Sequence, residues 1–376
     1  MSPLLPLATV ALGTLLASAL VPASRSLARR IGALDAPGPR RIHRTPTPRL
    51  GGVGVFATFA LLALGGLLAV PPEWHRLPGN RLVALLAGAS AAFGVGLLDD
   101  LLGDRFPVRL KLLGQLVAAL ILVVGGDVST SFLPTPWLNA LVAVLWIVGI
   151  TNAFNLIDNM DGLSAGVALI ASGILIVNAW LRGETAIVLI LAAFMGSVAG
   201  FLRFNLRPGW VFLGDCGSHF IGYVMAAVTL LEGYGCQASS SLFPVLMPVV
   251  VLAVPIVDTV TVVVIRLREG RPIHVGDTRH LSHQLLSRGF SPRGALVVIY
   301  LLAASLGLAA FSLTDASAAR SLTILLQVGG IVGVMLTLAF GMPAAGAAAR
   351  ARPVAGARAP ASLSRRRPEQ RTGIAA

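Results

Sequence analysis

Residues 137–166, WLNALVAVLWIVGITNAFNLIDNMDGLSAG, contain an apolar run that is followed at once by carboxamides and carboxylates. The apolar part, residues 137–154, has the length and composition of a helix that crosses a membrane. Asp158 and Asp161 stand three residues apart directly after it. Carboxylates next to lipid are energetically expensive and are usually retained for function. This pattern predicts a spanning helix that ends in a polar, functional cluster.

The spacing of the polar residues indicates how they share a helix face. Asn152, Asn155 and either Asp158 or Asn159 are separated by three or four residues, so they lie on one face if the helix continues. The structural alternative is a polar helix end with an Asx turn, in which Gly162 stops the helix. The rest of the chain decides between these readings.

The composition excludes an ordinary soluble domain. The chain has 376 residues, of which 56% are apolar and 12% charged, and its mean hydropathy is +0.83. Soluble domains carry about 25% charged residues. Long apolar runs recur without the alternating pattern of barrel strands, so we expect an all-α, polytopic membrane protein. The first run lacks basic residues ahead of it, so it is expected to be retained rather than cleaved as a signal peptide. Cys216 and Cys236 form neither a disulfide framework nor a metal motif.

Eleven spans are predicted, and the basic residues orient them. The spans are 3–23, 51–70, 80–98, 110–125, 137–154, 162–181, 184–202, 216–233, 242–265, 293–313 and 321–341. With the N-terminus outside, 25 of the 29 basic residues face the cytoplasm. The positive-inside rule therefore predicts an outside N-terminus and a cytoplasmic C-terminus. The net charge of +13 follows from this topology and from anionic lipid, so no nucleic-acid partner is expected.

The domain organisation follows from the same spans. Residues 1–342 are predicted to form a single membrane domain with cytoplasmic catalytic loops. Residues 343–376 are rich in Ala, Pro, Gly and Arg without apolar periodicity, which is typical of a disordered tail.

Most of the scarce carboxylates fall on the predicted cytoplasmic side. Four cytoplasmic segments carry the polar constellations: Asp99, Asp100 and Asp104; Asp158 and Asp161; Asp215; and Asp277. Asp258 lies inside the ninth span, roughly two helical turns from its inner end. A transporter would place its ionisable groups near the bilayer midplane, whereas these lie at span ends. Such oxygen ligands suit Mg²⁺ together with substrate phosphates. The pattern indicates phosphoryl-transfer chemistry at the cytoplasmic face.

Two further features fit anionic substrates. The sequence Gly-Asp-Cys-Gly-Ser at 214–218 precedes a predicted helix, whose first amides could help to bind an anion. Its structural alternative is a turn with an N-cap serine. Lys111 is the only lysine in the chain, and its alternative is a snorkelling membrane anchor. Any arginine would serve as an anchor, so the single lysine favours a role in the site.

His280 and His283 occupy one helix face in the last cytoplasmic segment. A zinc pair is disfavoured because no third ligand of suitable type is spaced nearby. Contacts to a phosphate or a proton are the functional reading, and solvated loop histidines are the alternative. His43, which follows Arg-Ile and precedes Arg44, has the same ambiguity.

Together these segments resemble the polyprenyl-phosphate N-acetylhexosamine-1-phosphate transferases, the superfamily that includes the lipid I synthases. Five motifs carry the resemblance, in order: His43 with Pro46, Pro48, Arg49, Gly51 and Gly52; Asp99-Asp100; Asn152, Asn155, Asp158, Asp161 and Gly162; Phe212-Leu-Gly-Asp-x-Gly-Ser218; and Asp277, His280 and His283. The Pro-x-Pro-Arg-x-Gly-Gly form and the eleven-span count look like the branch that transfers N-acetylglucosamine-1-phosphate. Ser282 stands where the commoner pattern has a further histidine, and Asn159 where it has glycine.

The resemblance implies a reaction and a set of roles. The sugar-1-phosphate of a UDP-sugar, UDP-N-acetylglucosamine, moves to undecaprenyl or decaprenyl phosphate, and UMP is released. Mg²⁺ is the expected cofactor, with Mn²⁺ as a substitute. By resemblance the catalytic residues are Asp99, Asp100, Lys111, Asp158 and Asp161; the substrate-binding residues are His43, Arg49, Asn152, Arg279, His280 and His283; and the metal ligands are Asn155 and Asp215. The implied setting is the bacterial inner membrane, where the reaction begins a cell-wall or surface polysaccharide; a homodimer is compatible with the family.

Three alternatives remain at this stage. Within the family, the donor could be another UDP-N-acetylhexosamine or UDP-MurNAc-pentapeptide. Outside it, a secondary transporter could use the same acids to bind a coupling ion.

Overall fold

The computed structural model describes residues 2–35, 45–69, 77–232, 243–272, 277, 279–313 and 317–340. The first half contains α1 (Leu4–Ile31), β1 (Leu34–Asp35), β2 (Thr47–Pro48), α2 (Gly51–Ala69), α3 (Gly79–Leu102), η2 (Gly103–Arg105), α4 (Val108–Leu120) and the π-helical η3 (Ile121–Gly125). The middle contains α5 (Pro136–Ile157), α6 (Leu163–Leu181), α7 (Thr185–Asn205) and α8 (Gly214–Leu231). The last part contains η4 (Phe243–Leu246), α9 (Met247–Val251), α10 (Ala253–Arg268), α11 (Leu281–Ser287), α12 (Pro292–Ser312) and α13 (Ala318–Phe340).

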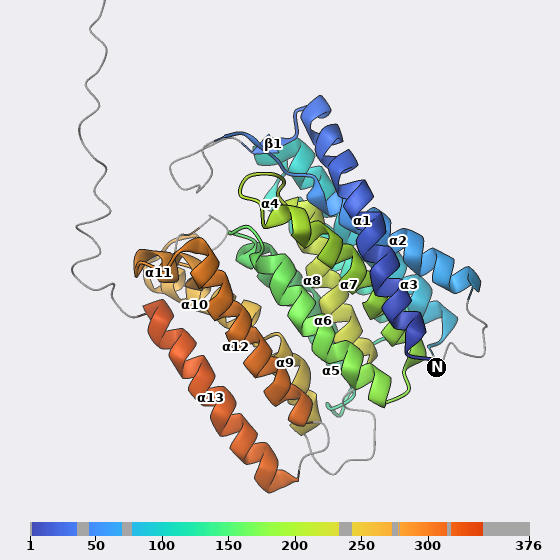
Figure 1. Ribbon diagram of the computed structural model, residues 1–376. Helices are drawn as coiled ribbons and strands as arrows, with labels where there is room; N and C mark the ends of the chain where they lie inside the picture. The colour runs from blue at the N-terminus through green and yellow to red at the C-terminus, as the bar shows by residue number, and fades with distance from the viewer. Residues whose placement is uncertain are drawn as a thin grey trace, which may run out of the picture.

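The architecture is an all-α bundle of long helices that lie side by side (Figure 1). Among the described residues, eight helices are long and apolar enough to cross a membrane. They are α1, α3, α4 with η3, α5, α6, α7, α12 and α13. The predicted class, a polytopic helical membrane protein, is confirmed. Exposed leucines such as Leu15, Leu145 and Leu326 on the outer faces of these helices suit contact with lipid.

Helices also occupy the three remaining predicted spans, but they are shorter or interrupted. α2 and α8 are continuous, whereas the predicted span 242–265 is divided into α9 and α10 at Leu252. Pro255 accounts for the break, because it has no N–H to donate to the Val251 carbonyl and its ring crowds that carbonyl. Whether these three segments cross the bilayer stays a prediction. The predicted tail, 343–376, lies outside the described residues.

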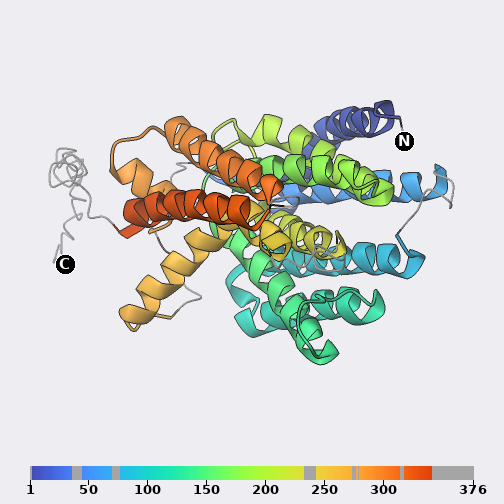
Figure 2. The same ribbon diagram turned by 90° about the horizontal axis from the view of Figure 1, so that it is seen from below.

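α8 forms the centre of the bundle. Every residue from Cys216 to Thr229 is buried, because α8 packs against α2, α3, α5 and α6. α13, in contrast, is largely exposed and lies at the edge of the bundle (Figure 2). A helix that is apolar on all sides is favoured at such a central position. The first residues of α8 are therefore held firmly at one end of the bundle, where the cavity described below opens.

Extended backbone joins two of the sequence motifs at this same end. β1 and β2 pair antiparallel, with Leu34 opposite Pro48. Phe212 N–H then donates to the Pro48 carbonyl over 2.8 Å, and Gly51 N–H donates back to the Phe212 carbonyl over 2.9 Å. Gly52 N–H donates to the Leu213 carbonyl. The Pro-x-Pro-Arg-x-Gly-Gly motif thus lies along the segment that leads into α8.

Candidate active site

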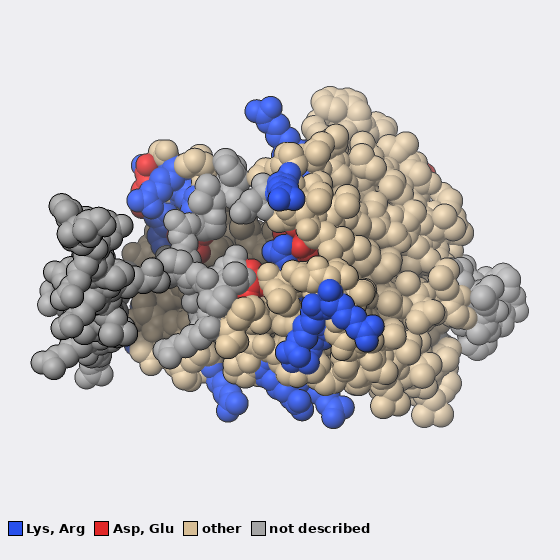
Figure 3. All heavy atoms as spheres, turned by 90° about the horizontal axis from the view of Figure 1, so that it is seen from above, with Lys and Arg blue, Asp and Glu red and all other residues tan. Residues whose placement is uncertain are grey.

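A cavity of about 1180 Å³ lies where α3 ends and α8 begins, with Asp100, Gly214 and Asp215 in its wall. Viewed from above, acidic atoms line the hollow and basic side chains lie around it (Figure 3). The acidic lining residues are Asp35, Asp100, Asp158, Asp161, Asp215 and Asp277, and the basic ones are Arg49, His283 and Arg293. The cavity therefore combines many carboxylates with a few cations.

Four helices form one polar cluster, and two of its members, Asn155 and Asp215, line the cavity. Lys111 Nζ, on α4, donates to Asp99 Oδ2 on α3 and to Asp215 Oδ2 on α8, over 2.6 Å in each case. Asn155, on α5, donates through Nδ2 to Asp215 Oδ1 over 2.8 Å and to Ser218 Oγ over 3.0 Å. Asp99, Asn155 and Asp215 come from three separate motifs, and the structure brings them together with Lys111. Lys111 lies at the centre of this cluster, so its position argues against a simple membrane anchor.

Asp100 faces a different partner from its neighbour Asp99. Its carboxylate is 3% exposed and accepts the backbone N–H groups of Asp215, over 3.0 Å, and Cys216, over 2.9 Å. These amides open α8, where a negative charge is favoured by the helix dipole. The sequence suggested that these amides could bind an anion, and in the structure that anion is the Asp100 carboxylate. Arg49 in turn donates through Nη2 to the Asp100 carbonyl.

Gly214 allows this arrangement of Arg49, Asp100 and α8. Its φ is +76°, which lies in the left-handed region. A Cβ atom on Gly214 would lie 2.0 Å from the Arg49 carbonyl oxygen and 2.6 Å from Asp100 Oδ2. Glycine is therefore required here both by backbone conformation and by space.

Asp158 and Asp161 lie in the turn between α5 and α6. Asp158 lines the cavity; burial raises its pKa well above the ordinary value, and the charges of Asp215, Asp161 and Asp100 raise it further. Asp161 accepts the Gly209 N–H over 3.3 Å. Carboxylates that destabilise each other's ionised form are stabilised by a cation between them. The cavity is thus suited to a positively charged ligand.

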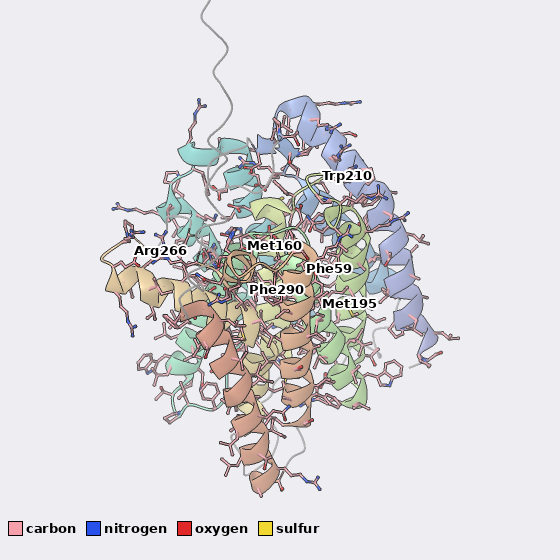
Figure 4. The ribbon with its side chains drawn as sticks, turned by 60° about the vertical axis from the view of Figure 1, so that its left-hand side comes forward. Phe59, Met160, Met195, Trp210, Arg266 and Phe290 are labelled. Carbon is pink, nitrogen blue, oxygen red and sulfur yellow. The ribbon has the colours of Figure 1, made fainter. Side chains whose placement is uncertain are left out.

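Side chains of α7 and α12 form hydrogen bonds with the turn that carries these acids. Gly162 N–H donates to Asn205 Oδ1 over 2.6 Å, and the Tyr300 hydroxyl donates to the Gly162 carbonyl over 2.5 Å. Gly162 has φ +84° and precedes α6, so it begins the next helix rather than stopping α5. Met160 lies in the same turn (Figure 4).

The two histidines of the last motif have different surroundings. His283 lines the cavity, and its pKa is lowered by burial and by nearby His280, so the ring is mostly neutral at pH 7. His280 is buried against α10, with Nδ1 2.6 Å from Asp258 Oδ2, and does not line the cavity. Arg279 pairs with Asp277 and Glu269 instead of facing the hollow.

The remaining predicted site residues can be placed as follows. Asn152 exchanges hydrogen bonds with Gln115 on α4, over 2.6 and 3.3 Å, and does not line the cavity. His43 lies outside the described residues. The sequence assigned no role to Asp258, Asn205 or Tyr300. Only Asp258 had a readable signal, as an isolated ionisable residue within an apolar span.

The donor chemistry of the cavity fits Mg²⁺. Within the described ranges, no group of three His, Cys, Asp or Glu side chains forms a preformed metal cage. Mg²⁺ does not need one, because it commonly uses one or two protein carboxylates together with waters and substrate phosphates. Asp215 and Asn155 lie at the cavity wall, and burial together with the charges of Asp215, Asp161 and Asp100 raises the pKa of Asp158 beside them.

Comparison with known proteins gives one family. The sequence profile of glycosyl transferase family 4 matches residues 82–232, which run from α3 to the end of α8. A probable undecaprenyl-phosphate N-acetylglucosaminyl 1-phosphate transferase of Bacillus subtilis is 34% identical over 315 residues, covering 81% of this chain and 84% of that protein. A decaprenyl-phosphate N-acetylglucosaminephosphotransferase of Mycobacterium tuberculosis is 32% identical, covering 74% of each chain. An undecaprenyl-phosphate alpha-N-acetylglucosaminyl 1-phosphate transferase of Escherichia coli K12 is 28% identical, covering 75% of this chain and 77% of that protein.

Proposed function

Because the chain belongs to the polyprenyl-phosphate N-acetylhexosamine-1-phosphate transferases and is a phosphoglycosyl transferase of the membrane, we propose that its donor is UDP-N-acetylglucosamine and that UMP is released. The acceptor is undecaprenyl or decaprenyl phosphate. The product begins a lipid-linked cell-wall or surface polysaccharide. The observation that carries this proposal is the hydrogen-bonded cluster of Lys111, Asp99, Asp215 and Asn155, of which Asp215 and Asn155 line the acidic cavity.

The reaction is a displacement at phosphorus. An oxygen of the polyprenyl phosphate forms a bond to the β-phosphorus of the UDP-sugar, and the bond from that phosphorus to the bridging oxygen breaks. The leaving group is UMP, which takes the bridging oxygen and its electron pair. The acceptor phosphate has a second pKa of about 6, so it is mostly dianionic near pH 7. Positioning and charge neutralisation therefore matter more than removal of a proton.

We assign the residues of the cluster to the two substrates by their geometry. Lys111 has its ammonium group between Asp99 and Asp215, where it can move to a phosphate oxygen as substrates enter. Asp99 is the acid of the pair that contacts Lys111, and we assign it to the acceptor side. Asp100 has both oxygens committed to the amides of α8, so it holds Asp215 in place instead of acting as a base.

Mg²⁺ is the proposed cofactor, with Mn²⁺ as a substitute. Asp215 and Asn155 would hold it, and Asp158 would lie beside it in the cavity. When bound, the ion supplies charge neutralisation for the pyrophosphate of the donor. The part played by the chain itself is to orient these oxygens from rigid helix ends.

The proposed setting is the bacterial inner membrane, with eleven spans, an outside N-terminus and the cavity on the cytoplasmic side. The distribution of arginine supports this orientation. Basic side chains surround the hollow at the upper end of the bundle, as positive-inside topology requires for a cytoplasmic face (Figure 3).

The test is UMP release from purified protein in detergent supplied with UDP-N-acetylglucosamine, polyprenyl phosphate and Mg²⁺. Wild type is expected to release UMP, and Asp215→Asn to release none above background. Asp127→Asn is the matched control, because Asp127 is an exposed carboxylate in a left-handed turn that asparagine tolerates. Competition among UDP-sugars identifies the donor, and preference for UDP-MurNAc-pentapeptide would contradict the proposal. Absence of UMP release with every donor would also contradict the proposal.

A further inference from the structure

Asp258 is a buried carboxylate in α10 that belongs to none of the motifs. It is 5% exposed and does not line the cavity. Both of its oxygens nevertheless have partners in the segment that follows α10: Oδ2 lies 2.6 Å from His280 Nδ1, and Oδ1 accepts the Leu281 N–H over 2.7 Å. An ionisable group inside an apolar helix is costly unless such partners compensate it. Asp258 is therefore kept where it is by residues that lie 22 and 23 positions later in the chain.

These contacts fix the start of α11. Its N-cap residue, His280, makes no side-chain capping hydrogen bond to α11, and Asp258 accepts the first amide from across the interface instead. A carboxylate at a helix N-terminus is favoured by the dipole. Because the carboxylate accepts from Nδ1, the ring of His280 carries its proton on that nitrogen. The residue at which α11 begins is thus fixed by a contact with α10 rather than by a capping side chain of α11 itself.

A second contact holds α11 on its other side. Ser282 is 1% exposed, and its hydroxyl donates to Asn159 Oδ1 over 2.6 Å. Asn159 lies in the turn between α5 and α6 that carries Asp158 and Asp161. These are also the two positions at which this chain departs from the commoner family pattern, and they contact each other. α11 is consequently fixed between α10 and the acidic turn.

The residue after Ser282 is His283, which lines the cavity. We propose that Asp258 is a positioning residue, which acts through α11 to hold His283 against the substrate in the cavity. This role rests on the proposed function, since it needs a substrate that His283 contacts. Asp258 and His280 do not line the cavity, and they contact each other instead. Asp277, which precedes α11, forms a separate 2.8 Å ion pair with Arg266 (labelled in Figure 4). This ion pair does not replace the contact of Asp258 with His280.

The test is a double-mutant cycle of Asp258→Asn and His283→Ala, measured as kcat/KM for the donor. Asparagine retains one oxygen for the Leu281 amide but cannot accept from His280 Nδ1, so Asp258→Asn is expected to lower kcat/KM about tenfold. Added to His283→Ala, it is expected to cause less than a further twofold loss, because the two changes remove the same contact. Losses that multiply would show that Asp258 acts on general stability and would overturn the proposal. Full activity of Asp258→Asn would also overturn it.

Thr261→Val is the matched control. Thr261 is buried in α10, three residues after Asp258, and its hydroxyl bonds none of the described residues. It is expected to leave kcat/KM unchanged. Amide hydrogen exchange provides a readout that does not depend on turnover: exchange in α11 should rise in Asp258→Asn and not in Thr261→Val, and equal protection would contradict the proposal. A wild type that releases no UMP refutes the proposed function, whereas an active wild type with multiplicative losses refutes only the positioning role.

Discussion

Gly96 lies where α3 packs against the start of α8, and its replacement tests the geometry of the site. A Cβ atom on Gly96 would lie 2.2 Å from the Asp215 carbonyl oxygen and 2.6 Å from the Cys216 Cα atom. Ordinary contacts of a Cβ atom begin near 3.4 Å, and both neighbours are backbone atoms that cannot rotate away. Gly96→Ala must therefore push α3 and α8 apart by about 1 Å, which is a typical overpacking change of about 1–3 kcal/mol.

This displacement would move Asp99 and Asp215, which are proposed to take part in the reaction. Asp99 is less than one helical turn after Gly96, and it is joined to Asp215 through two 2.6 Å contacts with Lys111. A displacement of about 1 Å at a reacting site can lower the rate by about 100-fold. Gly96→Ala is therefore expected to lower kcat by about two orders of magnitude and to lower the melting temperature.

Gly94→Ala provides the control in the same helix. A Cβ atom on Gly94 meets nothing within 4 Å, so alanine should preserve activity and stabilise α3 by about 0.5–1 kcal/mol. UMP release and thermal unfolding are measured for both variants in the same detergent. The reasoning would be refuted if Gly96→Ala had activity within twofold of Gly94→Ala and the same melting temperature. The close packing of α3 on α8 would then not determine the geometry of the site.

The other predictions concern charge in the cavity. Lys111→Met retains the length of the side chain but leaves Asp99 and Asp215 without their shared cation, so UMP release should fall at least about 100-fold; full activity would remove Lys111 from the site. Asp158→Asn should raise the melting temperature of metal-free protein at pH 7 while reducing UMP release. The raised pKa of Asp158 means that its ionised form opposes folding above the unfolded pKa of about 3.9, so the gain should shrink as the pH falls towards 4; a gain independent of pH would contradict this reasoning. Chelation with EDTA should abolish UMP release and added Mg²⁺ should restore it, with Mn²⁺ also supporting turnover; activity that persists in EDTA would refute the proposed cofactor.

The sequence was sufficient for the class of fold and for the gathering of the site. Apolar runs give the helices because each span must satisfy its backbone groups internally. Scarce carboxylates at helix ends could be predicted to meet, and Asp100, Asp158 and Asp215 do line one cavity. The break at Leu252 was also readable in principle, since Pro255 stands four residues after Val251.

The different contacts of Asp99 and Asp100 could not be predicted from the sequence. Asp99 and Asp100 are adjacent and chemically identical, and successive residues on a helix point about 100° apart. Only the packing of α4 and α8 decides which of them meets Lys111 and which meets the amides of α8. The contact of Ser282 with Asn159 was hidden for a similar reason, because it joins residues 123 positions apart through tertiary structure alone.

The bond from Cys216 N–H to Asp100 has a consequence for biogenesis. Synthesis proceeds from the N-terminus, so Asp100 enters the membrane region 116 residues before this amide exists. Until α8 emerges from the ribosome, the first seven helices carry a carboxylate at the end of α3 that lacks its two amide donors. A truncated product that stops before Gly214 would lack both amide donors of Asp100, and Arg49 would remain as a cation near this carboxylate.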